Sequence, residues 1–445
     1  MESKRRTNEI TRNRLSRRSF IGGAFAALTG AGAIGLRSLA AGLNARADEL
    51  PKIKQYRTLG RTGFEVSDVG LGSGELSEPS LLDSILDAGV NYIDTAEGYI
   101  RGGVERTIGE IIRHRERKKL FISTKLGLRV DVTKAQIIER TNKCLERMKT
   151  NYVDCLMIHM PSTRKALDNP AYHAAFQELN AQGKVRFRGL SNHGPQWNDV
   201  PETMEQVTLA AVEDGRFDVM LFVYNFLQQE QGERILKACR EKGVGATLMK
   251  TNPVLNYFEM NENYETSKAE GRNTAFMEKI LPRLKERYDA AQGFIRKFGL
   301  KDFNQIREAA VRFVLSNPNV NTACLTIKNF DDLEFYVGLS GKTFNPVDQE
   351  LLTAYASGLG EFYCRHACGA CESVCPARVP VNTIMRYYHY FRAQEREKSA
   401  LQKYAALSGN RAEACENCAG PCESVCPYGV PIHGLLWQAH RTLML

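Results

Sequence analysis

Two runs of cysteine near the end of the chain have the residue types and the spacing to hold metal. Eight of the 12 cysteines lie within residues 364–426. The first run is Cys364, Cys368, Cys371 and Cys375, and the second is Cys415, Cys418, Cys422 and Cys426. Short gaps let one loop place three thiols around a cluster, and the Cys-Pro that ends each run supplies a fourth. The pattern predicts two 4Fe-4S clusters.

The two runs resemble the cysteine motifs of bacterial ferredoxins, in which the last cysteine of each motif binds the other cluster. Each run has one extra residue, between Cys364 and Cys368 and between Cys418 and Cys422. The sequence therefore leaves the pairing of ligands open. Structural zinc tolerates these spacings as well, whereas disulfides between such close cysteines would be strained. The doubled Cys-Pro ending favours clusters over both alternatives.

A second group of reactive side chains lies at the ends of three consecutive predicted strands. One strand ends in Asp94, with Tyr99 in the loop that follows, the next ends in Lys125 and the third in His159. The C-terminal ends of strands in a parallel barrel face one mouth, where such folds carry their chemistry. We therefore expect these four side chains to meet. A single charged residue there would be explained as a solvent-exposed side chain at the rim of the barrel. Four groups suited to one reaction are not explained in that way.

The four residue types together suit the reduction of a carbonyl group. A tyrosine is a weak acid near neutral pH, and a nearby ammonium group such as Lys125 lowers its pKa by favouring the phenolate. Asp94 would hold Lys125 charged, and His159 would orient the carbonyl oxygen. In the reverse direction Tyr99 would act as the base in alcohol oxidation.

The elements that position these residues follow from hydropathy. Eight short apolar runs are predicted strands: Val66–Gly72, Val90–Asp94, Leu120–Lys125, Tyr152–His159, Val185–Ser191, Phe217–Tyr224, Val244–Lys250 and Val320–Ile327. Helical patterns lie between them, for example Val104–Arg113 and Lys134–Lys149, and over residues 303–317 and 331–340. Eight alternating units predict an α/β fold, the TIM (β/α)8 barrel. An open doubly wound sheet is the alternative, but Gly70, Gly72 and Gly74 lack the third spaced glycine of its phosphate turn.

The barrel is expected over residues 48–345, with an insertion over 255–300 that is either a surface loop or a lid over the catalytic face. After residue 345 the pattern changes to cysteine-rich loops and two helical segments, Val381–Gln402 and Val430–Leu443. Residues 346–445 are therefore predicted to form a small, mainly helical, ferredoxin-like domain.

Residues 56–340 resemble the aldo/keto reductase family. The resemblance begins with Tyr56–Gly63 and is strongest at Asp94–Tyr99, which matches the Asp/Tyr motif of that family with Ile100 where glycine is common. Lys125 and His159 complete the family's catalytic tetrad. The resemblance implies a TIM barrel, a carbonyl or alcohol substrate, and NADP(H) as the usual cofactor.

The resemblance also implies a set of cofactor-binding residues, which is only partly present. Positions that match are Ser191, Asn192, Tyr224, Lys328 and Asn329. Leu221 stands where the family usually has Gln, Lys250 ends the strand where a Tyr commonly stacks on the nicotinamide, and Phe335-Tyr336 replaces a usual Glu-Asn pair. The substrate-activating groups are thus complete, and the nicotinamide-binding groups are not.

The N-terminus has the features of an export signal. Arg17 and Arg18 form a twin-arginine sequence, a weakly apolar run covers Gly22–Leu36, and Ala45-Arg46-Ala47 is a cleavage site. Residues 1–47 are therefore a predicted twin-arginine signal peptide, and the mature protein is expected in the periplasm without a stable membrane span. Of the formal net charge of +9, residues 1–47 carry seven. The remainder is too nearly neutral to indicate a nucleic-acid partner.

These features predict an exported oxidoreductase of the aldo/keto reductase type, whose iron–sulfur clusters exchange electrons with a redox partner. The alternative is an electron-transfer protein whose barrel is a non-catalytic docking scaffold. The identity of the substrate and of the partner does not follow from any motif, because loops build the substrate pocket of such barrels.

Overall fold

A computed structural model gives the fold and describes residues 50–193, 202–254, 289, 292–300, 304–360, 363–394, 396–416 and 418–444. Contacts along the chain separate residues 1–50 from residues 51–445. The predicted signal peptide lies outside the described residues, and so does most of the predicted insertion. Among the helices of the described ranges, none combines the length and apolarity needed to cross a bilayer.

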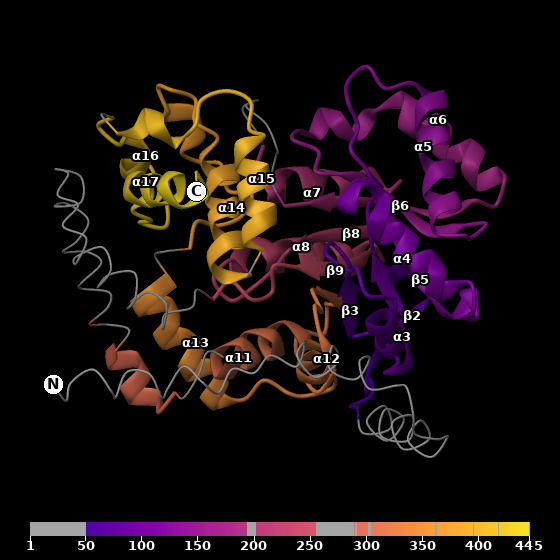
Figure 1. The fold of residues 1–445 in the computed structure, drawn as a ribbon, viewed down its shortest axis with the longest axis horizontal. Coiled ribbons are helices and arrows are strands. Elements are labelled where there is room, and N and C mark those ends of the chain that lie inside the picture. Colours follow the sequence, from indigo (N-terminus) through magenta and orange to yellow (C-terminus); the bar gives the residue numbers. More distant parts are fainter. Residues whose placement is uncertain are drawn as a thin grey trace, which may run out of the picture. The chain divides into compact units, whose positions relative to one another are not determined.

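Eight parallel strands close into a barrel, as the alternating pattern predicts (Figure 1). Around the barrel the order is β10-β3-β4-β5-β6-β7-β8-β9. The strands are β3 (Val69–Gly72), β4 (Tyr92–Asp94), β5 (Phe121–Leu126), β6 (Val153–His159), β7 (Val185–Asn192), β8 (Val219–Val223), β9 (Gly245–Met249) and β10 (Thr322–Leu325). The open-sheet alternative is wrong, because β10 pairs with both β3 and β9 and leaves the sheet no edge.

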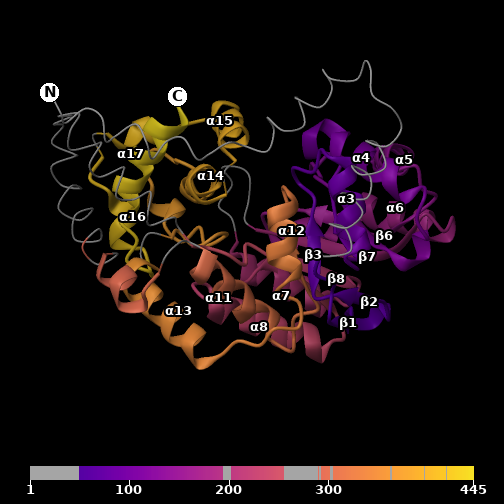
Figure 2. The same cartoon turned by 60° about the horizontal axis from the view of Figure 1, so that its bottom comes forward.

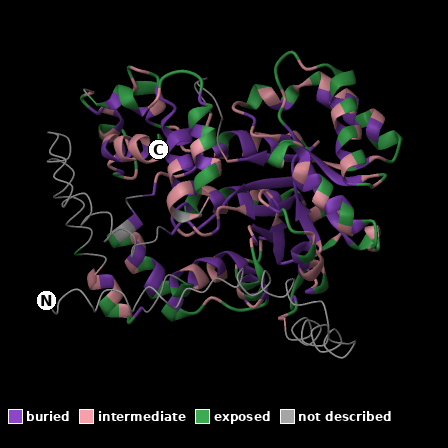
Figure 3. Cartoon of the chain, viewed as in Figure 1, coloured by how far each residue is buried: buried purple, intermediate pink, exposed green. Residues whose placement is uncertain are grey.

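Helices cover the outside of the barrel and bury one apolar face each. They are α3 (Pro79–Asp87), α4 (Gly103–Ile112), α5 (Lys134–Arg147), α6 (Pro170–Ala181), α7 (Met204–Asp214), α8 (Gln229–Glu241), α11 (Asn304–Leu315) and α12 (Phe330–Val337). Local sequence sets where several begin. Capping boxes start α5 at Thr133 and α7 at Thr203, and Pro170 follows the N-cap Asn169 of α6. Burial is continuous along β4, β5 and β8, whereas the first half of β7 has exposed and half-buried residues (Figure 3).

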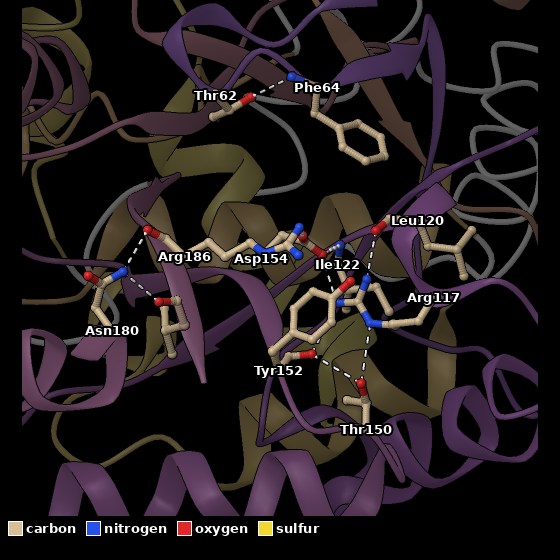
Figure 4. A network of polar contacts seen from close by, with 11 residues as sticks. Thr62, Phe64, Arg117, Leu120, Ile122, Thr150, Tyr152, Asp154, Asn180 and Arg186 are labelled. Atoms are coloured by element: carbon tan, nitrogen blue, oxygen red, sulfur yellow. Dashed lines mark hydrogen bonds and ion pairs between the residues drawn. The ribbon is translucent and has the colours of Figure 1, made fainter. Parts of the chain in front are cut away.

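The N-terminal end of the barrel is held by a buried carboxylate. Asp154, at the start of β6, accepts hydrogen bonds from Arg117 at 2.7 Å, Arg186 at 3.1 Å and the backbone N–H of Ile122 at 2.9 Å (Figure 4). The two guanidinium groups lie 4.0 and 4.2 Å from the ring centroid of Tyr152. The antiparallel pair β1 (Tyr56–Thr58) and β2 (Glu65–Ser67) precedes the barrel. This end stabilises the fold and leaves the other end for chemistry.

The C-terminal region forms a helical group with its own core (Figures 1 and 2). Helix α13 (Pro346–Leu359) packs with α11 in a cluster that includes Leu351 and Tyr355. The separate core comprises residues from Cys371 to Leu443. Its helices are α14 (Val381–Ala393), α15 (Glu397–Ala405), α16 (Pro421–Ser424) and α17 (Ile432–Leu443). The helical segment predicted over Val381–Gln402 is therefore two helices, α14 and α15.

Candidate active site

The structure brings the four predicted catalytic side chains together at the C-terminal ends of β4, β5 and β6. The Nζ atom of Lys125 donates to Asp94 Oδ2 at 2.6 Å and to the carbonyl oxygen of Thr95 at 2.6 Å. It also lies 3.4 Å from the phenol oxygen of Tyr99. The Tyr99 and His159 rings are 6.3 Å apart and nearly perpendicular. Phenol, ammonium, carboxylate and imidazole thus surround one space.

Burial and charge fix the ionisation of the pair beneath Tyr99. Burial raises the pKa of Asp94, although the charge of Lys125 opposes the rise. Burial is also the largest single effect on Lys125 and disfavours its ammonium, but the charges and hydrogen bonds of Asp94 and Tyr99 together outweigh it and raise the pKa of Lys125. The Thr95 carbonyl gives Lys125 a second acceptor, which favours its charged form.

The sequence predicts that the Lys125 ammonium lowers the pKa of Tyr99, but in the structure the pKa of Tyr99 is raised. Burial raises the pKa of Tyr99, and this effect exceeds the lowering by Lys125 and Arg396. The phenol is therefore protonated at neutral pH, which is the form that donates a proton to a developing alkoxide. Burial also holds the pKa of His159 well below its ordinary 6.5, with Lys125 as the next cause. The imidazole is neutral.

The loop that carries Tyr99 adopts an unusual backbone. Ile100 and Arg101 have φ values of 46° and 52°, in the left-handed region that favours glycine. Ile100 is the position at which the sequence departs from the common glycine. A β-branched residue in this region is strained, so the chain retains backbone strain directly beside Tyr99.

The predicted nicotinamide-binding residues do not gather into one pocket. Ser191 and Asn192 end β7 at the mouth, and both are buried. Tyr224 lies instead against helix residues, where its hydroxyl bonds Glu233 and accepts from Asn317 at 3.0 Å and its ring lies 5.4 Å from Phe313. The ring of Tyr224, which follows β8, is therefore not available to stack on a nicotinamide.

The other two predicted positions are also engaged within the protein. Lys328 Nζ donates to the carbonyl oxygen of Gln394 at 3.4 Å, at the end of α14. Asn329 caps α12 by accepting from the backbone N–H of Asp332 at 2.8 Å. Both residues thus have partners within the protein.

The eight cysteines fall into two groups that mix the two runs. One cavity is lined by Cys364, Cys368, Cys371 and Cys426, so the last thiol of the second run joins three of the first. Burial raises the pKa of Cys415 to about 12, and Cys375, Cys422 and Cys418 are the charges that add to it. Cys375 thus lies with the second run. All eight are free thiols.

Sequence reasoning missed a set of residues from the C-terminal region that lie at the barrel mouth. Arg386 on α14 donates to the backbone oxygen of His193 at 3.2 Å. Arg396, before α15, forms an ion pair with Glu75. Lys250, after β9, lies 4.1 Å from the ring centroid of Tyr390 on α14. The basic and aromatic composition of α14 was the available signal.

Comparison with known proteins identifies the class. The model of the aldo/keto reductase family matches residues 75–353, which is more than half of the chain. The chain therefore belongs to the aldo/keto reductase family, whose members are oxidoreductases. The matched range ends before the first cysteine run.

Two sequence relatives agree with this class. The chain is 32% identical over 170 residues to the uncharacterized oxidoreductase YqkF of Bacillus subtilis, and this match spans 35% of the chain and 54% of that protein. It is 25% identical over 319 residues to the aldo-keto reductase YhdN of the same species, covering 66% of the chain and 92% of the relative. A solved aldo-keto reductase from Bacillus halodurans, in its holo form, has 21% identity and a TM-score of 0.49 over 67% of the chain and 95% of its own.

Proposed function

We propose that this protein interconverts a carbonyl group and an alcohol on a small substrate, with Tyr99 as the acid and base. The observation that carries the proposal is the chain Tyr99–Lys125–Asp94, with steps of 3.4 Å and 2.6 Å at the end of adjacent strands. Lys125 and Asp94 are buried, whereas Tyr99 is partly accessible. A phenol that a substrate can reach, backed by a fixed ammonium, is suited to proton transfer at one oxygen atom.

Each member of the group has a separate task in reduction. Reduction of a carbonyl takes two electrons and two protons. Two single-electron transfers from the redox partner, with a proton from water for the carbon, would supply one part, while Tyr99 donates its proton to the substrate oxygen and Lys125 stabilises the phenolate left behind. Asp94 and the Thr95 carbonyl hold Lys125 in place. Neutral His159 donates an N–H to the same oxygen as negative charge develops there. In oxidation the Tyr99 phenolate takes the proton of the alcohol.

The eight cysteines support a further part of the proposal, that the C-terminal region holds two 4Fe-4S clusters. Four thiols line one cavity, and the exchange of the last thiol between runs is the ferredoxin arrangement. Among the described residues no three His, Cys, Asp or Glu side chains converge on a single ion. A 4Fe-4S cluster takes one thiolate at each corner of its four-iron body, so four thiols around one cavity support the proposal. Bound clusters would pass electrons one at a time.

The source of the electrons is part of the same proposal. NADP(H) is the usual cofactor of the family, but Tyr224, Lys328 and Asn329 are engaged elsewhere, so the residues present fit it poorly. We propose that electrons pass between the clusters and a redox partner. Titration of the cluster-loaded protein with NADPH tests this point, and tight binding would restore a role for nicotinamide.

The place of action is also a proposal. The twin-arginine sequence at Arg17 and Arg18 supports export of the folded protein to the periplasm. Fractionation of cells that produce the full chain tests it. A variant with Lys at both arginine positions should remain in the cytoplasm.

The experiment that tests the proposed catalysis compares Tyr99→Phe with Tyr56→Phe. Turnover is measured over a panel of aldehydes, with NADPH and with reduced methyl viologen as alternative donors. Tyr99→Phe should lose about 10²- to 10⁴-fold in turnover because it removes a general acid. Tyr56 is 44% exposed, and its hydroxyl donates to the carbonyl oxygen of Gly89, so its variant should behave as the parent. Equal turnover in both variants would leave the barrel as a docking scaffold.

A further inference from the structure

A lysine at the barrel mouth is held in a strained conformation that the proposed catalysis does not use. Lys250 follows β9 and has a φ of 57°, in the left-handed region. Asn225 fixes this turn by donating to the Lys250 carbonyl oxygen at 2.9 Å. A glycine would adopt this backbone without strain. Strain of this kind is retained where a side chain is needed at one place.

The partner of Lys250 is a phenol from the C-terminal region rather than a carboxylate. Its Nζ atom lies 4.1 Å from the ring centroid of Tyr390, a buried residue of α14. The guanidinium of Arg396 lies 4.9 Å from the same centroid. Despite burial, Lys250, Arg386 and Arg396 lower the pKa of Tyr390 to about 7. Burial in turn lowers the pKa of Lys250 to about 8.

Contacts connect this group to the catalytic side chains. Arg386 lies 3.3 Å from His193 Nδ1, and the His193 ring is 6.3 Å from that of His159. On the other side, the Arg396 guanidinium and the Tyr99 ring both lie 3.8 Å from the Cβ position of Gly74. The cations therefore border the space in front of the catalytic side chains.

The balance of charge at this place is positive. Arg396 is paired with Glu75, and burial raises the pKa of Glu372 although Arg386 opposes the rise. Within the described ranges no carboxylate lies within ion-pair distance of Lys250. His389 nearby is 5% exposed, and neither of its ring nitrogens has a hydrogen-bond partner in the described structure. Lys250 thus lacks a balancing carboxylate among the described residues, and a cation held away from water without an anion is unfavourable, so the site favours an anionic ligand.

We propose that Lys250 and Tyr390, with Arg386 and Arg396 around them, form a subsite for the carboxylate or phosphate of an anionic substrate. The carbonyl or alcohol of that substrate lies at Tyr99. The inference rests on the proposed function, because it names the class of substrate for the same site. It also gives the C-terminal region a second task, since three of the four subsite residues come from it.

Binding of the anion should be coupled to the uptake of a proton by the protein. Tyr390 is faced by Lys250, Arg386 and Arg396, by Lys403 on α15 and by the neighbouring Tyr387 ring. A bound carboxylate replaces the phenolate as the negative partner of these cations, and so raises the pKa of Tyr390. At pH 8 the protein should then take up a proton with each anion bound.

The test measures binding by calorimetry at pH 8 with two matched pairs of probes. 4-Oxobutanoate is compared with butanal, and glyceraldehyde 3-phosphate with glyceraldehyde, so that the two pairs separate a carboxylate from a phosphate site. At least one charged probe should bind about 10- to 100-fold more tightly than its neutral match. Repetition in buffers of different ionisation enthalpy should reveal proton uptake by Tyr390 and Lys250, which Tyr390→Phe and Lys250→Met should each reduce.

Variants of Lys250 separate binding from folding. Lys250→Met removes the charge, and Lys250→Gly also relaxes the left-handed backbone, so the glycine variant should fold at least as well as the parent. Both should lose the 10- to 100-fold preference for the charged probe while neutral binding is unchanged. Lys398→Met, an exposed site on α15, serves as the control and should retain the preference.

Each outcome bears on one claim. Equal binding of charged and neutral probes, or an undiminished preference in Lys250→Gly, would overturn the subsite. So would tight NADPH binding that Lys250→Met weakens while 4-oxobutanoate binding stays the same, because the cations would then serve a nucleotide. Failure of the proposed catalysis is distinguishable, since Tyr99→Phe should still bind the charged probe with its full preference.

Discussion

At the scale of single residues, burial decides the chemistry of the site more than charge does. Lys125 is buried against Asp94, yet the pKa of Tyr99 is raised rather than lowered, because loss of water outweighs the nearby ammonium. The pKa of His159 is depressed for the same reason. Both groups are thus neutral over the physiological range, one as a proton donor and the other as a hydrogen-bond donor.

This ionisation predicts the pH dependence of carbonyl reduction. Tyr99 must be protonated to act, and its raised pKa keeps it protonated until the pH exceeds about 10, the ordinary value of tyrosine. His159 must be neutral, and its depressed pKa keeps it neutral until well below pH 6.5. We expect kcat/KM for a neutral aldehyde, which does not use the cations around Tyr390, to be level between pH 6.5 and 9. A profile that falls with a midpoint near pH 8 would show that Tyr99 ionises within the range.

The strained residue beside Tyr99 makes a second prediction at this scale. Ile100→Gly should raise the free energy of unfolding by about 0.5 to 1 kcal/mol, because glycine adopts a φ of 46° without the steric cost. Denaturant unfolding measures the change. Val130→Gly, at an exposed loop position without a positive φ, should be neutral or destabilising. A loss of stability in Ile100→Gly equal to that control would show that the loop is not strained.

At the scale of elements, the strands could be predicted and some side-chain directions could not. All eight predicted strands are present in the structure. Asp94, Lys125 and His159 lie close together because they lie at the ends of three neighbouring strands of the barrel. Tyr224 was expected at the mouth but lies among helix residues. Strands of a parallel barrel are apolar on both faces, so the sequence shows no alternation from which the direction of Tyr224 could be read.

The network at the N-terminal end of the barrel joins elements rather than reactants. Asp154→Asn should therefore lower the free energy of unfolding by about 2 to 3 kcal/mol, because Arg117 and Arg186 lose their shared carboxylate. Turnover should not change, since the network lies at the opposite end from Tyr99. Asp131→Asn removes an exposed ion pair and serves as the control. A fall in turnover in Asp154→Asn that Asp131→Asn does not show would contradict the assignment of stability to one end of the barrel and of chemistry to the other.

At the scale of the whole molecule, the C-terminal region contributes to the mouth of the barrel. The sequence predicted the cysteine region as a separate ferredoxin-like domain and gave no reason to join it to the site. The contacts that do so, Lys250 with Tyr390 and Arg386 with His193, join residues more than a hundred positions apart. Pairing over such distances is set by how the elements pack, which local patterns do not encode.

The crossed arrangement of the thiols predicts which cluster each cysteine serves. Cys426→Ser should remove the cluster of the first run, because Cys426 shares a cavity with Cys364, Cys368 and Cys371. Iron content should fall from about eight to about four atoms per chain. Combining Cys426→Ser with Cys364→Ser should cost no further iron, whereas combining it with Cys415→Ser should remove the remainder. The opposite pattern would mean that each run binds its own cluster.

The most direct test of the central claim is a double-mutant cycle in turnover over Tyr99→Phe and Lys125→Met. If Lys125 acts only by supporting the Tyr99 phenol, each single change should cost about 10²-fold or more and the double variant should be no slower than Tyr99→Phe alone. Far-ultraviolet circular dichroism of each variant checks that the fold is retained. Losses that multiply in the double variant would contradict the account, because the phenol and the ammonium would then act independently.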